Sequence, residues 1–227
     1  MWKINTIYTM PYRIDAINNN CYYHVFNRGV NKLATFIDDR DCNQALLSMN
    51  YYRFKKPPMK LSRYKSLSLT EQTRLQTILL NTNQTLVDIC CFVLMPNHFH
   101  FILRQNLDNG VSTFIRKFTN SYARYFNTSH KWVGHLFQGQ FKAIEISSEE
   151  QLLHVSRYIH LNPLASGMVN KNTLKNYRWS SYSDYLRRNS NWIQIIDVPK
   201  NYEEFVLSHA DYARKLEYVK HFTLDTE

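Results

Sequence analysis

The segment 95–103, Met-Pro-Asn-His-Phe-His-Phe-Ile-Leu, constrains the fold more than any other part of this chain. Its two histidines, His98 and His100, are one residue apart in an otherwise largely apolar run. Successive side chains of a β-strand point to opposite faces, so the segment predicts a strand on which both imidazoles share one face. Such a pair suits a divalent metal ion that organises a phosphate. Two histidines of an ordinary sheet would give the same short motif.

The neighbouring sequence supplies the other elements that we expect. The apolar run 87–94 predicts a second strand, and residues 95–97 predict a tight turn that joins the two strands in an antiparallel hairpin. Aromatic and β-branched residues favour further strands over 21–27 and 141–146. Apolar spacing of three to four residues predicts helices after Asp38, over 69–80, from 111 to 125 and from 147 onward. This mixture of elements indicates the α+β class.

The helix that begins near residue 147 carries two polar residues of interest. Ser147 and Glu150 have the spacing of a capping box, and we expect proline 163 to end the helix. Tyr158 and Asn162 are four residues apart and therefore share one helix face. They are either capping and packing residues, or a nucleophile beside an amide that helps to hold a metal ion.

Composition narrows the class of partner. The net charge is +10 and aromatic residues make up 15% of the chain, a combination that favours a nucleic acid as the partner. The four cysteines lack Cys-x-x-Cys spacing, so we expect free, buried thiols in a reducing compartment. No apolar run approaches membrane-spanning length, so we expect a cytoplasmic protein without a membrane partner.

Several cations are candidate DNA contacts. Arg28 and Lys32 flank a predicted turn at Gly29, although a solvated turn is the better explanation of each residue taken alone. Arg116, Lys117 and Arg124 lie on the predicted helix that begins near residue 111, where a plain amphipathic helix with a basic outer face is the alternative. We expect two further histidines to have no special role, His24 within the first strand and His160 on the surface.

With these residues identified, the chain resembles the single-tyrosine HUH transposases. That group includes the IS200-like insertion-sequence transposases and the REP-associated tyrosine transposases of bacteria. The resemblance covers residues 20–185 and rests on five motifs in the family's order, at 23–29, 95–100, 134–142, 158–163 and 177–182. A single His-x-His motif is weak evidence, whereas five ordered motifs are strong evidence.

The resemblance implies a site and a reaction. His98, His100 and Asn162 match the family's ligands for Mg²⁺ or Mn²⁺, and Tyr158 matches the nucleophile that attacks a phosphate of single-stranded DNA beside a hairpin. The products would be a 5′-phosphotyrosine link and a free 3′-hydroxyl. The motif 134–142 implies DNA contacts by Gln138 and Lys142, but glutamine stands at position 140, where the family commonly has arginine.

The resemblance also implies an architecture. A central antiparallel sheet of the ferredoxin-like HUH palm would carry helices, and the tyrosine helix would be delivered to the His-x-His strand. Some family members form homodimers in which one subunit's tyrosine serves the other's histidines, and others look monomeric. Residues 1–185 would form the transposase domain. Residues 186–227 would form an extension with a strand at 192–196 and a helix at 202–218, interpreted as a packing appendage.

Two other functions stay open on the sequence alone. A non-cleaving protein descended from such enzymes could hold structured DNA or RNA through the same basic, aromatic surface. A zinc hydrolase built on His98 and His100 is a weaker alternative, because no third histidine or carboxylate follows at a convincing spacing.

Overall fold

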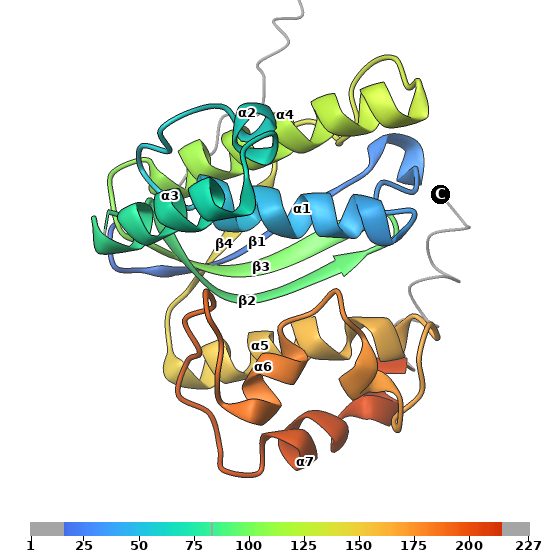
Figure 1. Cartoon of the computed structure of the whole chain (residues 1–227). Helices are drawn as coiled ribbons and strands as arrows, with labels where there is room; N and C mark the ends of the chain where they lie inside the picture. The colour runs from blue at the N-terminus through green and yellow to red at the C-terminus, as the bar shows by residue number, and fades with distance from the viewer. Residues whose placement is uncertain (1–15, 83, 215–227) are drawn as a thin grey trace, which may run out of the picture.

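The computed structural model describes residues 16–82 and 84–214. These residues form three layers, with an antiparallel sheet between two groups of helices (Figure 1). The expected α+β class is confirmed. Within the described ranges, no helix has both the length and the apolar character needed to cross a bilayer.

The sheet has four strands, β1 (Tyr22–Arg28), β2 (Val87–Met95), β3 (His98–Gln105) and β4 (Lys142–Ile146). Their order across the sheet is β2-β3-β1-β4, and all neighbours are antiparallel. β2 and β3 form the expected hairpin and are buried on both faces. The register of β1 on β3 places His24 opposite Ile102 and Phe26 opposite His100. These four side chains therefore share one face of the sheet.

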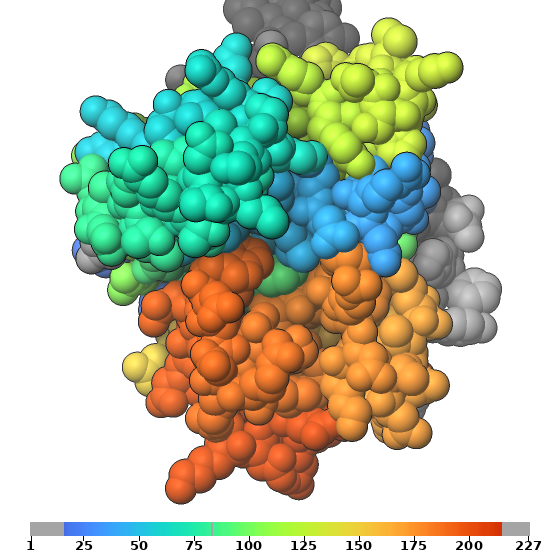
Figure 2. Space-filling model, in the orientation of Figure 1, coloured from blue at the N-terminus to red at the C-terminus, as the bar shows by residue number. Residues whose placement is uncertain are grey.

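One group of helices covers the face of the sheet opposite the two histidines of β3. It consists of α1 (Asp39–Tyr52), α2 (Leu61–Lys65), α3 (Leu69–Asn81) and α4 (Gly110–His130), which lie together above the sheet in Figure 1 and form the upper part of the surface in Figure 2. A short 3-10 turn, η1 (Val30–Lys32), follows β1. The core here is aromatic: Phe99 and Phe101 of β3 lie against Phe118 of α4, with ring centroids 5.5 and 5.8 Å away.

The second group of helices covers the face that carries the two histidines of β3. It consists of α5 (Glu149–Ala165), the 3-10 turn η2 (Leu174–Asn176), α6 (Tyr182–Arg187) and α7 (Tyr202–Leu207), which lie below the sheet in Figure 1. α5 contacts β2, β3 and β4 directly, and α7 packs on α5. α5 is therefore the helix that can bring side chains to the β3 histidines.

The predicted ends of α5 were wrong by one residue at the start and by two at the end. The N-cap is Ser148, whose hydroxyl accepts the backbone N–H of Gln151 at 3.1 Å, while the Gln151 side chain accepts from the backbone N–H of Ser147. Two adjacent serines offer two caps, and the second has the extended backbone that a cap requires. Pro163 lies within the last turn of α5, where its missing N–H removes a single helical bond, so the helix continues to Ala165.

His160 is buried, and its predicted surface position was wrong. Its ring is fully inaccessible and lies 2.8 Å from the Tyr202 hydroxyl, 2.9 Å from Ser181 Oγ and 3.1 Å from Cys91 Sγ. Tyr202 is on α7, Ser181 immediately precedes α6 and Cys91 is on β2. His160 therefore joins these helices to the sheet. Burial lowers the pKa of His160 to about 3.

The C-terminal extension differs from its prediction. Residues 192–196 form no strand among the described residues, and a single backbone bond from Gln194 to the Ile89 carbonyl, 3.0 Å long, joins them to the sheet. The edge of β2 is already occupied by residues 179–181, through the bonds from Leu94 to Trp179 and from Ser181 to Phe92. The predicted helix at 202–218 is broken after Leu207, and residues 215–218 lie outside the described residues.

Candidate active site

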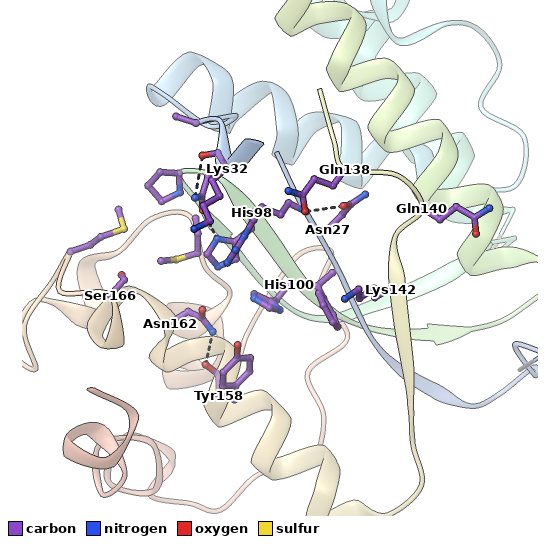
Figure 3. Close-up of a pocket in the computed structure, with 17 residues that line it drawn as sticks. Asn27, Lys32, His98, His100, Gln138, Gln140, Lys142, Tyr158, Asn162 and Ser166 are labelled. Carbon is purple, nitrogen blue, oxygen red and sulfur yellow. Dashed lines mark hydrogen bonds between the residues drawn. The ribbon is translucent and has the colours of Figure 1, made fainter. Parts of the chain in front are cut away.

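A cavity of about 690 Å³ lies between the sheet and the C-terminal half of α5. His98 and His100 line it from β3, and Tyr158 and Asn162 line it from α5. Figure 3 shows these four side chains grouped together, with Tyr158 and Asn162 on the side of α5 that faces β3. The structure thus brings together the four residues that the sequence singled out as a possible catalytic set.

The two histidines share a sheet face, as strand geometry requires. Their ring centroids are 5.1 Å apart and their planes are nearly perpendicular, at 87°. His100 is 6% exposed, whereas His98 is half-buried at the mouth of the β2–β3 turn. Phe26 of β1 packs against His100 with a centroid distance of 5.4 Å. A strand buried on its other face holds both rings, so neither depends on a loop for its position.

Tyr158 and Asn162 reach the cavity from consecutive turns of α5. The Tyr158 ring is 41% exposed and stands edge-on to His100, with a centroid distance of 5.4 Å. The Asn162 Nδ2 donates a hydrogen bond of 2.9 Å to the Tyr158 carbonyl, which leaves the amide oxygen of Asn162 as its acceptor atom. A solvent-accessible phenol therefore lies beside two imidazoles and an amide oxygen.

His24 is a site residue that the sequence interpretation missed. Its Nε2 lies 2.9 Å from His100 Nδ1, and its ring is edge-on to Tyr158 at 5.9 Å. Burial lowers the pKa of His24 to about 4. The alternation of β1 indicates the face on which His24 lies, but its contact with His100 depends on the β1–β3 register, for which the sequence carries no local signal.

The candidate DNA contacts separate into two groups. Arg28, Lys32, Gln138 and Lys142 line the active-site cavity, as does Gln140. Backbone bonds tie this rim together: Gly29 donates to the Asn97 carbonyl at 2.7 Å, and Gln138 donates to the Arg28 carbonyl at 2.8 Å. The cations beside the histidines are thus held by the strand ends and the 134–142 loop.

The other group lies on the opposite side of the sheet. Arg116, Lys117 and Arg124 of α4 line a groove of about 670 Å³ together with Lys60 and Lys65, which we call the helix-face groove. None of the described residues that line it is acidic. Burial, with a smaller effect from Arg116, lowers the pKa of Lys117. Lys117 and Arg124 therefore line a surface separate from the cavity, whereas Arg116 also lines a smaller groove that includes Asn27 and Gln140 of the cavity rim.

The donor atoms of the cavity are compatible with a divalent cation. Two imidazoles and one amide oxygen line it from two elements, and nitrogen and oxygen donors of these types can bind such an ion. Among the described residues, no three histidine, cysteine, aspartate or glutamate side chains form a metal-binding group.

A sheet that presents paired histidines to a helix bearing tyrosine and asparagine defines an α+β protein with the HUH transposase fold. Residues 59–162 match the family described as "Transposase IS200 like". The segment that carries the candidate site is thus similar to the IS200-like transposases. No curated protein matches the chain.

Comparison with solved structures gives alignments at low sequence identity. A REP-associated tyrosine transposase bound to a REP hairpin aligns with a TM-score of 0.53 and 15% identity, over 84% of this chain and 100% of that chain. A putative transposase from Deinococcus radiodurans R1 aligns with a TM-score of 0.36 and 11% identity, over 65% and 95% of the two chains. The tRNA(His) guanylyltransferase of Saccharomyces cerevisiae gives 0.38 and 12%, over 88% and 80%.

Proposed function

We propose that this transposase cleaves and rejoins single-stranded DNA beside a hairpin, with Tyr158 as its nucleophile. The observation that carries the proposal is the meeting, in one cavity, of an exposed tyrosine on α5 with paired histidines on β3. An ordinary packing tyrosine would have its ring buried in the core, as Tyr182 and Tyr185 do. A tyrosine nucleophile needs open access to its substrate and a nearby positive charge, because a phenol is largely protonated at neutral pH.

The cleavage step exchanges one phosphoester for another. The Tyr158 hydroxyl oxygen attacks the scissile phosphorus, the new O–P bond forms, and the bond from phosphorus to the 3′ oxygen breaks. The phenol releases its proton and the departing 3′ oxygen gains one, so the step consumes no other reactant. The products are a 5′-phosphotyrosine link and a free 3′-hydroxyl, and attack by a 3′-hydroxyl on the link reverses the step and rejoins strands.

A divalent cation, Mg²⁺ or Mn²⁺, is part of this proposal. His98, His100 and Asn162 would hold it, since their side chains converge on the cavity beside Tyr158. When bound, such an ion polarises a phosphate oxygen and offsets the charge that develops in the displacement. The protein's own contribution is to hold the tyrosine and the ligands on two rigid elements that face each other.

The two basic regions suggest how DNA is held. Arg28, Lys32 and Lys142 would neutralise phosphates of the strand in the active-site cavity, with Gln138 as a neutral donor. The helix-face groove would contact a separate length of the same DNA through Arg116, Lys117 and Arg124. Clustered cations with no acid beside them favour a polyanion over a small ligand.

The C-terminal part would serve the site indirectly. Tyr202 of α7 bonds to His160 and lies 2.9 Å from Ser156 Oγ, and both of these residues are on α5. We therefore propose that residues 186–214 support the nucleophile helix and make no direct contact with DNA.

A homodimer, a cytoplasmic location and a domain boundary near residue 185 stay predictions. One chain contributes His98, His100, Tyr158 and Asn162 to the same cavity, and we propose that cleavage uses the four residues of one copy.

The proposal is tested with labelled single-stranded oligonucleotides that carry the hairpins flanking the gene. Protein and oligonucleotide are incubated with Mg²⁺ or Mn²⁺ and separated on a denaturing gel. We expect a slow-moving protein–DNA adduct that disappears with EDTA and with Tyr158→Phe. The matched control is Tyr212→Phe, which changes another exposed tyrosine, 61% accessible, that does not line the cavity. Tight binding with no adduct on any flanking hairpin would favour the non-cleaving binding protein.

A further inference from the structure

Both histidines of β3 are contacted at the same ring nitrogen. His98 Nδ1 lies 2.6 Å from the Asn97 side-chain oxygen, and His100 Nδ1 lies 2.9 Å from His24 Nε2. We propose that Asn97 and His24 are positioning residues that fix the tautomer and the orientation of the two rings. Each ring then presents Nε2 to the cation. This inference rests on the proposed function, because it assumes that the histidines bind a metal ion.

Asn97 determines the tautomer of His98. Its amide nitrogen donates to the Lys32 carbonyl at 3.4 Å, which assigns the amide oxygen to the contact with His98. An amide oxygen only accepts hydrogen bonds, so the proton of neutral His98 must be on Nδ1. The lone pair that a metal ion requires is then on Nε2.

His24 has the corresponding role for His100. The two ring centroids are 5.1 Å apart and the planes differ by 23°, while the nitrogens are 2.9 Å apart. These values describe two nearly coplanar rings joined edge to edge by an in-plane hydrogen bond, and not two rings stacked face to face. If His100 binds the cation through Nε2, its Nδ1–H donates to His24 Nε2, and His24 carries its own proton on Nδ1.

Strand register makes this contact possible. His24 and His100 are diagonal neighbours on one face of β1 and β3, because His24 is opposite Ile102 and Phe26 is opposite His100. Metal-binding histidines usually donate their second ring N–H to a neighbouring acceptor, and loss of that acceptor typically costs about 10- to 100-fold in metal affinity or activity. Asn97 from the turn and His24 from β1 supply one such acceptor for each ring.

Three variants separate positioning from simple packing. His24→Phe keeps an aromatic ring beside His100 but removes the acceptor, whereas His24→Gln restores an acceptor at a similar reach. Asn97→Ala removes the acceptor of His98. The matched control is His154→Phe, which makes the same chemical change at a half-exposed histidine of α5 that contacts Arg157 and Glu150.

The first readout uses protein without metal. Two-bond ¹H–¹⁵N spectra of the imidazoles distinguish a protonated Nδ1 from a protonated Nε2. We expect the Nδ1–H tautomer for His98 and His100 in the wild-type protein, and its loss for His100 in His24→Phe and for His98 in Asn97→Ala. An Nε2–H tautomer at His100 in the wild-type protein would overturn the role of His24.

The second readout is the affinity for Mn²⁺ alone, measured by electron paramagnetic resonance. We expect about 10- to 100-fold weaker binding in His24→Phe and Asn97→Ala, recovery in His24→Gln and no change in His154→Phe. If His24→Phe and Asn97→Ala both bind Mn²⁺ as tightly as the wild-type protein, this inference is overturned and the proposed function stays intact. Failure of the wild-type protein to bind Mn²⁺ would overturn the proposed metal site, and this inference with it.

Discussion

Lowering the pH should destabilise the protein through His160. The imidazole is fully buried among Tyr202, Ser181 and Cys91, and its pKa is lowered to about 3 by that burial. In the unfolded chain the same group titrates near 6.5. Between these values the unfolded state binds a proton that the folded state excludes, so the free energy of unfolding falls as the pH decreases.

The size of the effect follows from the two pKa values. Above about pH 7 neither state is protonated at His160 and the group contributes no pH dependence. Below about pH 6.5, each unit of pH then lowers the free energy of unfolding by up to 1.4 kcal/mol. The loss amounts to about 2 kcal/mol at pH 5. His24, whose pKa is also lowered by burial, adds to the loss in the same direction.

The His160 contribution can be isolated by comparison with His160→Gln, which cannot titrate. Urea unfolding of both proteins at pH 7.5, 6 and 5 should show that the wild-type free energy falls by about 2 kcal/mol more than that of the variant. The contribution of His24 is present in both proteins and cancels. Equal pH dependences in the two proteins would refute the assignment of His160 as a buried neutral group.

Two further predictions concern the site's framework and its DNA contacts. In Gly29→Ala, the new Cβ would lie 2.3 Å from the Leu33 carbonyl oxygen. We expect a loss of about 1–3 kcal/mol in urea unfolding, and unchanged stability would contradict the close packing at this turn. Changing Arg116, Lys117 and Arg124 to glutamine together should weaken hairpin binding. The slope of log K against log salt concentration should become shallower by about 0.7–0.9 for each lost phosphate contact. Anisotropy titrations at several salt concentrations test this. If the variant has the same salt slope as the wild-type protein, the helix-face groove is not a DNA-binding surface.

Much of the site follows from local geometry. Alternation along a strand places His98 and His100 on one face, and the four-residue helical repeat aligns Tyr158 with Asn162, so both pairs were predictable from spacing. Each pair lies within a single element. The structure adds the packing of α5 on the sheet, which brings the two pairs into one cavity.

Other features depend on long-range pairing that no local pattern encodes. His24 meets His100 only because β1 and β3 pair in a particular register, although 76 residues separate the two in sequence. The sequence does not distinguish the α4 cations from the other candidate DNA contacts, because it does not show that α4 packs on the opposite side of the sheet. His160 was misassigned because its burial comes from α6 and α7, which are not apparent from the α5 sequence.

The central claim is that Tyr158 becomes covalently joined to DNA. The most direct measurement is mass spectrometry of the adduct after nuclease and trypsin digestion. Cleavage after Arg157 yields the peptide 158–171, in which Tyr158 is the only one of the chain's 16 tyrosines. The account predicts that this peptide carries one 5′-linked nucleotide. A nucleotide on any other tyrosine, or cleaved DNA with no nucleotide on the peptide 158–171, would contradict it.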